Sequence, residues 1–105
     1  MTSKKSDMNI EYGIEFSISA KKEWDRLSGD IKKQFKKKLD KLRYDPYSAP
    51  RLRGDLHGLF KVKLKSSGFR MVYQVIDNEI IILILGIGKR NNDDIYTSMK
   101  NMKIF

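Results

Sequence analysis

The sequence predicts an α+β protein in which a single antiparallel β-sheet packs against an N-terminal α-helical hairpin, with a short C-terminal helix after the sheet. Three observations predict this class. Apolar residues recur at helical spacing up to residue 42, alternate with polar residues from residue 59, and are almost continuous over residues 79–87. No internal repeat or linker divides the 105 residues, so we expect one domain over residues 10–105, preceded by a flexible tail at residues 1–9.

Residues 10–16 alternate between apolar residues and polar residues or glycine, which predicts a half-buried strand. Ser17 or Ser19 can cap the helix that follows, because a serine hydroxyl accepts a hydrogen bond from a free amide of the first turn. Ala20, Trp24 and Leu27 fall on one face of that helix.

A break at residues 28–30 separates a second predicted helix, which ends at Asp45 because the residue before Pro46 is biased away from helical geometry. Its inner face consists of apolar residues at helical spacing: Ile31, Phe35, Leu39 and Leu42. Its outer face is rich in lysine: Lys32, Lys33, Lys36, Lys37, Lys38 and Lys41. Such a face is either simply solvated or contacts a polyanion, and the pattern leaves both interpretations open.

Three strands and a last helix complete the predicted order β-α-α-β-β-β-α. Residues 60–65 alternate between apolar residues and lysine, residues 66–68 form a turn, and residues 69–76 form the next strand. A second turn at residues 77–78 leads to residues 79–87, whose β-branched composition is typical of a central strand buried on both sides, ended by Gly88. Asp93 and Asp94 suit the first turn of the C-terminal helix.

The charge of the chain indicates its partner. Lysine and arginine number 22 against 13 acidic residues, a formal net charge of +9. A small domain with this excess attracts polyanions, nucleic acid before acidic proteins or anionic lipid. No stretch approaches the roughly 20 apolar residues of a membrane span, so no membrane partner is expected.

Several kinds of catalytic site are excluded by residue content. The absence of cysteine removes thiol nucleophiles and zinc-thiolate sites, and suits a reducing cytoplasm. His57, the single histidine, cannot form a two-histidine ribonuclease site and is interpreted as a loop residue. Carboxylates are scattered rather than clustered as a two-metal nuclease requires, and the stretch at residues 86–90 lacks the spacing of a phosphate-binding loop. No metal and no cofactor are expected.

The remaining candidate site is a cationic sheet face. Lys61, Lys63 and Lys65 share one face of their strand. A connection with an even number of residues would place Lys63 opposite Arg70, whereas an odd number would turn Arg70 to the other face. Cations so placed could stabilise the transition state in which the 2′-hydroxyl of RNA attacks the adjacent phosphate. Arg90 and Tyr96 could reach the same concavity.

At these residues the sequence resembles the RelE family of bacterial toxin–antitoxin toxins. The segments that carry the resemblance are residues 22–24, 36–39, 52–54, 61–77, 88–90 and 95–96. The resemblance runs from about residue 10 to residue 99, and its middle segment is the most specific.

The resemblance implies a ribosome-dependent mRNA interferase that cuts the codon exposed in the ribosomal A site. The catalytic positions of the family fall on five residues: Lys61, Lys63, Arg70, Arg90 and Tyr96. Lys61 would act as base, Arg90 as acid, Lys63 and Arg70 would stabilise the phosphorane, and Tyr96 would stack or position. The residues expected to bind RNA are Arg53, Lys65, Lys89, Lys36 and Lys37.

The partners implied by the family are a cognate RelB-like antitoxin, the 70S ribosome at its A site, and operator DNA bound only through the antitoxin complex. Two alternatives stay open. One is a ParE-like inhibitor of gyrase on the same fold, and the other is a non-catalytic module that binds RNA or represses transcription.

Overall fold

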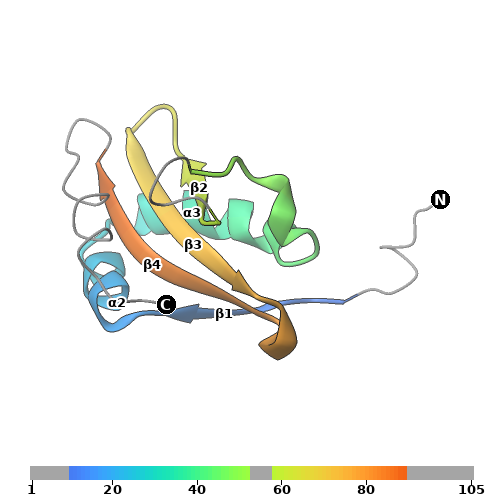
Figure 1. Cartoon of the computed structure of the whole chain (residues 1–105). Helices are drawn as coiled ribbons and strands as arrows, with labels where there is room; N and C mark the ends of the chain where they lie inside the picture. The colour runs from blue at the N-terminus through green and yellow to red at the C-terminus, as the bar shows by residue number, and fades with distance from the viewer. Residues whose placement is uncertain (1–9, 53–57, 90–105) are drawn as a thin grey trace.

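The computed structural model describes residues 10–52 and 58–89 and contains two α-helices, four strands and two short 3-10 helices in these ranges (Figure 1). Their order and bounds are β1 (Gly13–Phe16), α2 (Ile18–Asp25), α3 (Gly29–Leu42), η1 (Pro46–Ser48), β2 (Phe60–Lys63), β3 (Phe69–Ile76), η3 (Asp77–Glu79) and β4 (Ile81–Lys89). The predicted C-terminal helix lies outside the described residues. Within them, no helix is long and apolar enough to cross a membrane.

The four strands form one sheet in the order β1-β4-β3-β2. β3 pairs antiparallel with β2 and with β4, and β4 occupies the central place predicted for it, although it continues past Gly88 to Lys89. The prediction of an entirely antiparallel sheet is wrong, because β1 runs parallel to β4. Two helices between β1 and β2 return the chain to its starting end, so that β1, β2 and β4 all point the same way.

Both helices begin at a serine cap, the first at Ser17, one of the two serines expected, and the second at Ser28, within the predicted break. The Ser17 hydroxyl accepts from the amide of Ala20 at 3.1 Å, and the Ser28 hydroxyl accepts from the amide of Ile31 at 3.3 Å. The carboxylate of Glu23 on α2 also accepts from the backbone amide of Ile87 at 3.0 Å. Because β1 pairs with β4 only as far as Ile84, α2 thus protects the part of this strand edge that β1 leaves open.

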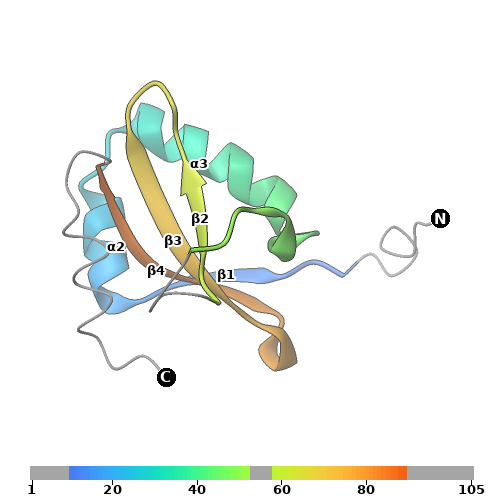
Figure 2. The same ribbon diagram turned by 45° about the horizontal axis from the view of Figure 1, so that its top comes forward.

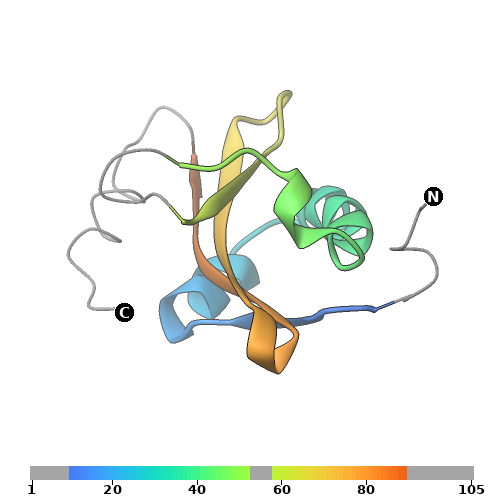
Figure 3. The ribbon, with the colours of Figure 1, turned by 45° about the vertical axis from the view of Figure 1, so that its right-hand side comes forward.

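The helical hairpin covers one face of the sheet, which Figures 2 and 3 show from two further sides. Apolar side chains from both helices and from β2, β3 and β4 pack together in one core on this face. Its buried members include Ala20, Phe35, Leu39, Leu42, Phe60, Val62, Met71, Tyr73, Ile82, Ile84 and Ile87. The helical spacing of α3 and the alternation of β2 therefore bury their apolar residues in the same core, as the sequence predicted.

A buried tyrosine ties this core to the connection after α3. The Tyr73 hydroxyl donates to the carbonyl of Pro46 at 2.6 Å, and its ring stacks on Phe60 with centroids 5.3 Å apart. Burial, followed by the nearby charge of Asp45, raises the pKa of Tyr73 above its ordinary value. The hydroxyl therefore stays protonated and keeps donating.

Asp77, at the turn between β3 and β4, holds two further tyrosines. The Tyr12 hydroxyl donates to Asp77 Oδ1 at 2.8 Å, and the Tyr47 hydroxyl donates to Oδ2. Hydrogen bonds from Tyr47 and then Tyr12 hold the pKa of Asp77 below its usual value. The hydrogen bond to Asp77, with burial, raises the pKa of Tyr47 to about 12. One carboxylate thus links the start of β1, the segment after α3 and the turn between β3 and β4.

Candidate RNA-binding face

The register between β2 and β3 brings three predicted site residues to one face of the sheet. Lys63 lies directly opposite Arg70, and Lys61 lies opposite Val72. The amide of Leu64 donates to the carbonyl of Phe69 at 2.9 Å, so that four residues, 65–68, form the connection. The even-numbered connection considered from the sequence is therefore confirmed, and with it the convergence of Lys61, Lys63 and Arg70, which we call the cationic face.

Burial of the alternate residues holds these cations outward. Phe60, Val62 and Met71 point into the core, and side chains on a strand alternate between faces. Lys63 is exposed, while Lys61 and Arg70 are half-buried. Like charges directly opposite each other on a sheet are destabilising. The pairing of Lys63 with Arg70 therefore costs the sheet some stability, and it creates a concentration of positive charge to which an anion would be attracted.

Next to Arg70, β4 contributes glycines to this face. Gly88 pairs with Arg70 and Gly86 pairs with Val72, and a bulge between Val72 and Tyr73 leaves Leu85 as the extra residue of β4. Because glycine has no side chain, β4 contributes only backbone at these two positions. At Gly88, which is half-buried, a substrate group can approach Arg70 more closely than over a residue with a side chain, whereas Gly86 is buried.

A groove of about 800 Å³ extends from the cationic face to α3. We call it the β2 groove, and its basic lining consists of Lys37, Lys38, Lys41, Lys61, Lys63 and Lys65. Apolar residues such as Val62, Leu64 and Pro50 and the polar residues Gln34, Ser48 and Ser66 form the rest of its lining, and none of the described lining residues is a carboxylate. Lys37 and Lys65 thus lie with Lys61 and Lys63, as an RNA-binding role requires.

Sequence reasoning did not single out Lys38 and Lys41 as site residues. Their spacing with Gln34, at i+4 and i+7, places all three along one flank of α3. That spacing was readable in the sequence. What could not be read was that this flank faces β2, because the packing angle of a helix on a sheet depends on tertiary contacts.

Two other predicted RNA-binding residues lie away from the cationic face. Lys36 lines a different groove, on the flank of α3 that faces β1. Lys89 pairs with Phe69 and lies over its ring, with Nζ 5.4 Å from the centroid, on the face opposite to Arg70. Arg53, His57, Arg90 and Tyr96 lie outside the described residues. The expectation that Arg90 and Tyr96 reach the cationic face therefore stays a prediction. Among residues 10–52 and 58–89, no group of three or more histidines, cysteines or carboxylates could hold a metal ion.

Comparison with known proteins identifies the family. Residues 14–94 match the family model described as the ParE toxin of the type II toxin–antitoxin system parDE. The mRNA interferase toxin RelE of Escherichia coli strain K12 is 39% identical over 89 residues, which cover 84% of this chain and 93% of that protein.

Solved structures agree with this match. The crystal structure of the isolated E. coli RelE toxin superimposes with a TM-score of 0.71 at 37% identity, over 84% of this chain and 94% of that one. A chain of the intact E. coli RelBE toxin–antitoxin complex also superimposes on this chain. The TM-score is 0.69 at 40% identity, over 74% of this chain and 95% of that one. This chain therefore belongs to the RelE family of toxins, within the RelE/ParE superfamily.

Proposed function

We propose that this protein is the toxin of a type II toxin–antitoxin system and acts as an mRNA interferase. The observation that carries the proposal is the cross-strand pairing of Lys63 with Arg70, with Lys61 on the same face. The name of the E. coli relative, mRNA interferase toxin RelE, supports the activity. The finer proposal is a metal-independent endoribonuclease that cuts mRNA in the A site of the 70S ribosome.

The proposed reaction uses the 2′-hydroxyl of the RNA as nucleophile. Lys61 removes its proton, the hydroxyl oxygen attacks the adjacent phosphorus, and the 5′-oxygen leaves with a proton from Arg90, which yields a 2′,3′-cyclic phosphate and a 5′-hydroxyl. Lys63 and Arg70 stabilise the extra negative charge of the phosphorane, and the arginine fork suits two phosphate oxygens. Tyr96 stacks on a base or positions it.

Further contacts position the RNA. The lysines of the β2 groove, including Lys37 and Lys65, follow the backbone away from the scissile phosphate. Arg53 and Lys89 add RNA contacts in this proposal. The protein acts in the cytoplasm, where ribosomes translate. A RelB-like antitoxin neutralises it, as the complex of the E. coli relative suggests, and operator DNA is bound only through that antitoxin.

The test is to add the purified protein to programmed ribosomes and to map the mRNA ends. Wild type should cut within the A-site codon, whereas Lys61→Ala and Arg70→Ala should each lose at least about a hundredfold in rate, the scale of removing one stabilising group from a phosphoryl or acyl transfer site. Lys22→Ala, which removes one exposed cation from α2, is the matched control and should cut normally. Cutting by Arg70→Ala at the wild-type rate would exclude the proposed site.

A second candidate is a ParE-like inhibitor of gyrase, which the description of the matching family model favours. Such an inhibitor has no use for a cation cluster aimed at a phosphate in single-stranded RNA. Gyrase supercoiling in the presence of the protein discriminates between the two activities. Blocked supercoiling without mRNA cleavage would support the ParE-like function.

A further inference from the structure

The segment that follows α3 lies along the outer edge of β2, where it borders the β2 groove. The amide of Lys61 donates to the carbonyl of Pro50 at 3.0 Å, and Arg51 forms an isolated antiparallel bridge with Phe60. These backbone contacts fix the segment to the sheet. The side chains that it carries therefore have defined positions relative to β2.

Two exposed side chains flank the part of this segment that lines the β2 groove, which is residues 48–50. Tyr47 precedes these residues and is 45% exposed, and Arg51 follows them and is also exposed. Both contact the ring of Phe60. The rings of Tyr47 and Phe60 meet at 74° with centroids 5.6 Å apart, and Cζ of Arg51 lies 5.3 Å from the Phe60 centroid. An exposed aromatic ring and a cation thus share one neighbour beside the groove.

The Tyr47 ring is held in one orientation before any ligand binds. Its hydroxyl donates to Asp77 Oδ2, and its ring rests against Phe60. The hydrogen bond to Asp77 is the main cause that raises the pKa of Tyr47 to about 12, while the positive charge of Arg51 acts in the opposite direction. The guanidinium of Arg51 therefore lies close enough to the hydroxyl to act on its ionisation. A side chain that is already ordered loses little entropy when a ligand stacks on it.

The β2 groove connects this pair of side chains with the cationic face. Six lysines line the groove, and none of its described lining residues is a carboxylate. Lys63 lies three residues from Phe60 along β2, which is about 10 Å at the usual rise of a strand. Arg51 forms no ion pair with any described residue, so its charge is available to a phosphate. The basic surface therefore continues from the proposed cleavage site to Tyr47.

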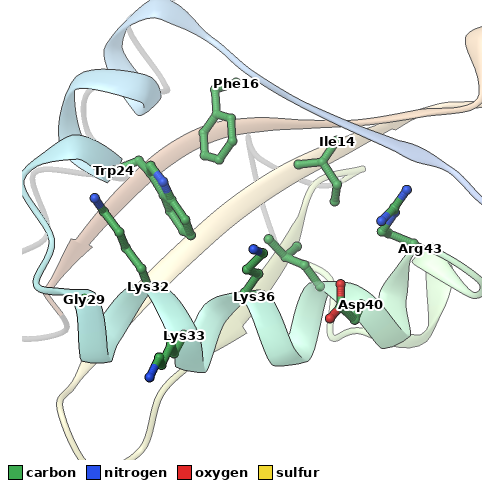
Figure 4. A pocket seen from close by; sticks show the side chains of 10 residues that line it. Ile14, Phe16, Trp24, Gly29, Lys32, Lys33, Lys36, Asp40 and Arg43 are labelled. Atoms are coloured by element: carbon green, nitrogen blue, oxygen red, sulfur yellow. The ribbon is translucent and has the colours of Figure 1, made fainter.

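The groove on the other flank of α3 is less suited to RNA. It has a volume of about 670 Å³ and lies between α3, α2 and β1 (Figure 4). Figure 4 shows Lys32 and Lys36 pointing from α3 toward β1, and Asp40 also belongs to the lining. The carboxylate of Asp40 repels phosphate. A strand of RNA is therefore attracted more strongly along the β2 groove, which leads to Tyr47.

We propose that Tyr47 and Arg51 form a nucleotide subsite for single-stranded RNA, beside the β2 groove and apart from the proposed cleavage site. A base stacks on the ring of Tyr47, and the guanidinium of Arg51 holds a phosphate of the same nucleotide. The base is uncharged, so the carboxylate of Asp77 does not repel it. The subsite rests on the proposed function, because that function makes single-stranded RNA the substrate. It adds a contact with a nucleotide that is not cut.

The test uses RNA that can bind but cannot be cut. The probe is a fluorescent oligouridylate of about 12 nucleotides, within the range of known single-strand binding sites, and 2′-O-methyl groups remove its nucleophile. Anisotropy measures its binding to the full-length protein. Tyr47→Ala should weaken binding about fivefold or more, the scale of one lost stacking contact. Tyr44→Ala is the matched control, because Tyr44 is 44% exposed and does not line the groove, and it should bind like the wild type.

Two conservative variants separate stacking from a structural role of Tyr47. Tyr47→Phe keeps the ring and should retain most of the affinity, although it loses the hydrogen bond to Asp77. Tyr47→Leu keeps an apolar contact with Phe60 but offers no aromatic face, so it should bind as weakly as Tyr47→Ala. Circular dichroism checks the fold of each variant. If Tyr47→Ala misfolds, the comparison of leucine with phenylalanine still tests the proposal.

The salt dependence of binding tests the role of Arg51. Arg51→Ala should reduce the slope of log affinity against log salt concentration by about 0.7, the contribution of one phosphate contact in a single strand. Tyr47→Leu should leave this slope unchanged, because a stacked base carries no charge. Arg26→Ala removes an exposed cation at the end of α2 and should change neither the affinity nor the slope.

The subsite is refuted if the wild type does not bind the oligonucleotide, if Tyr47→Leu binds as tightly as Tyr47→Phe, or if Arg51→Ala keeps the wild-type slope. These outcomes are distinct from failure of the proposed function, which the mapping of mRNA ends on ribosomes tests. A protein that cuts in the A site but binds RNA equally well without Tyr47 has lost the subsite only. A protein whose binding depends on Tyr47 and Arg51 but that cuts no mRNA has lost the nuclease activity only.

Discussion

Replacing Lys63 by glutamate should make the fold more stable while it abolishes RNA cleavage. In the wild type, Lys63 faces Arg70 across the strand pair, and glutamate would convert this like-charged pair into an opposite-charged one. Opposite charges at such positions contribute about 0.2–1 kcal/mol, and like charges cost a similar amount. Because Lys63 is exposed and water screens its charge, the exchange should raise the free energy of unfolding by roughly 0.2–1 kcal/mol.

Thermal unfolding followed by circular dichroism measures this gain. For a domain of this size, about 1 kcal/mol corresponds to a rise in Tm of roughly 4–8 °C. The gain should shrink in about 1 M salt, where the Debye length falls to about 3 Å. The same variant should lose cleavage of ribosome-bound mRNA, since glutamate repels the phosphate that Lys63 attracts.

The control separates the local pair from the net charge. Any exchange of lysine for glutamate lowers the formal charge of +9 by two and relieves general repulsion. Lys22→Glu makes this change at an exposed position of α2, where its neighbours at i+3 and i+4 are Asp25 and Arg26, so that a new repulsion and a new attraction offset each other. If Lys63→Glu unfolds at the same temperature as Lys22→Glu, or below it, the argument that the site costs stability is refuted.

Three further changes test the framework. Asp77→Ala should lower the free energy of unfolding by about 1–2 kcal/mol through loss of two tyrosine hydrogen bonds. Because the pKa of Asp77 is lowered in the fold, its contribution to stability should be complete above the ordinary pKa of 3.8 and disappear as the pH falls below it. Urea unfolding across pH 2–6 measures this pH dependence, and the Asp77→Ala variant should lack it. Tyr73→Phe should cost about 1–2 kcal/mol in the same assay, because a buried carbonyl loses its donor, and an unchanged midpoint would contradict that hydrogen bond. Ile80→Asn should stabilise by up to about 1 kcal/mol, because Ile80 has a φ of 55° that a β-branched residue adopts at a cost, and a lower Tm would count against this.

The local elements could be predicted from the sequence because each depends on neighbours along the chain. The serine cap at Ser17, the break before α3, the end of α3 before Pro46 and the alternation of β2 all have local causes. The pairing of Lys63 with Arg70 depended only on whether the connection between the two strands has an even or an odd number of residues, because the two strands of a hairpin are close in sequence.

Long-range features could not be predicted in the same way. Alternation in residues 10–16 indicates which side chains are buried but not which strand they join or in which direction, so the parallel pairing of β1 with β4 was missed. Likewise, six lysines on α3 read as one outer face, yet the structure divides them between two grooves, with Lys36 on one flank and Lys37 on the other. The side of a helix that meets a given strand is set by packing across the whole core.

The bulge in β4 has a consequence for how related sequences should be aligned. Leu85 is the extra residue, so Ile84 and Ile87 both face the core although three positions separate them, and Gly86 and Gly88 lie on the face that carries Arg70. A relative that lacked one residue at Leu85 would keep every neighbouring side chain on its present face, with a straighter strand. A gap or insertion between Gly86 and Gly88 would instead change which residue of β4 lies opposite Arg70. Gaps in this strand are therefore expected at one position only, and their placement indicates whether a relative retains the same surface.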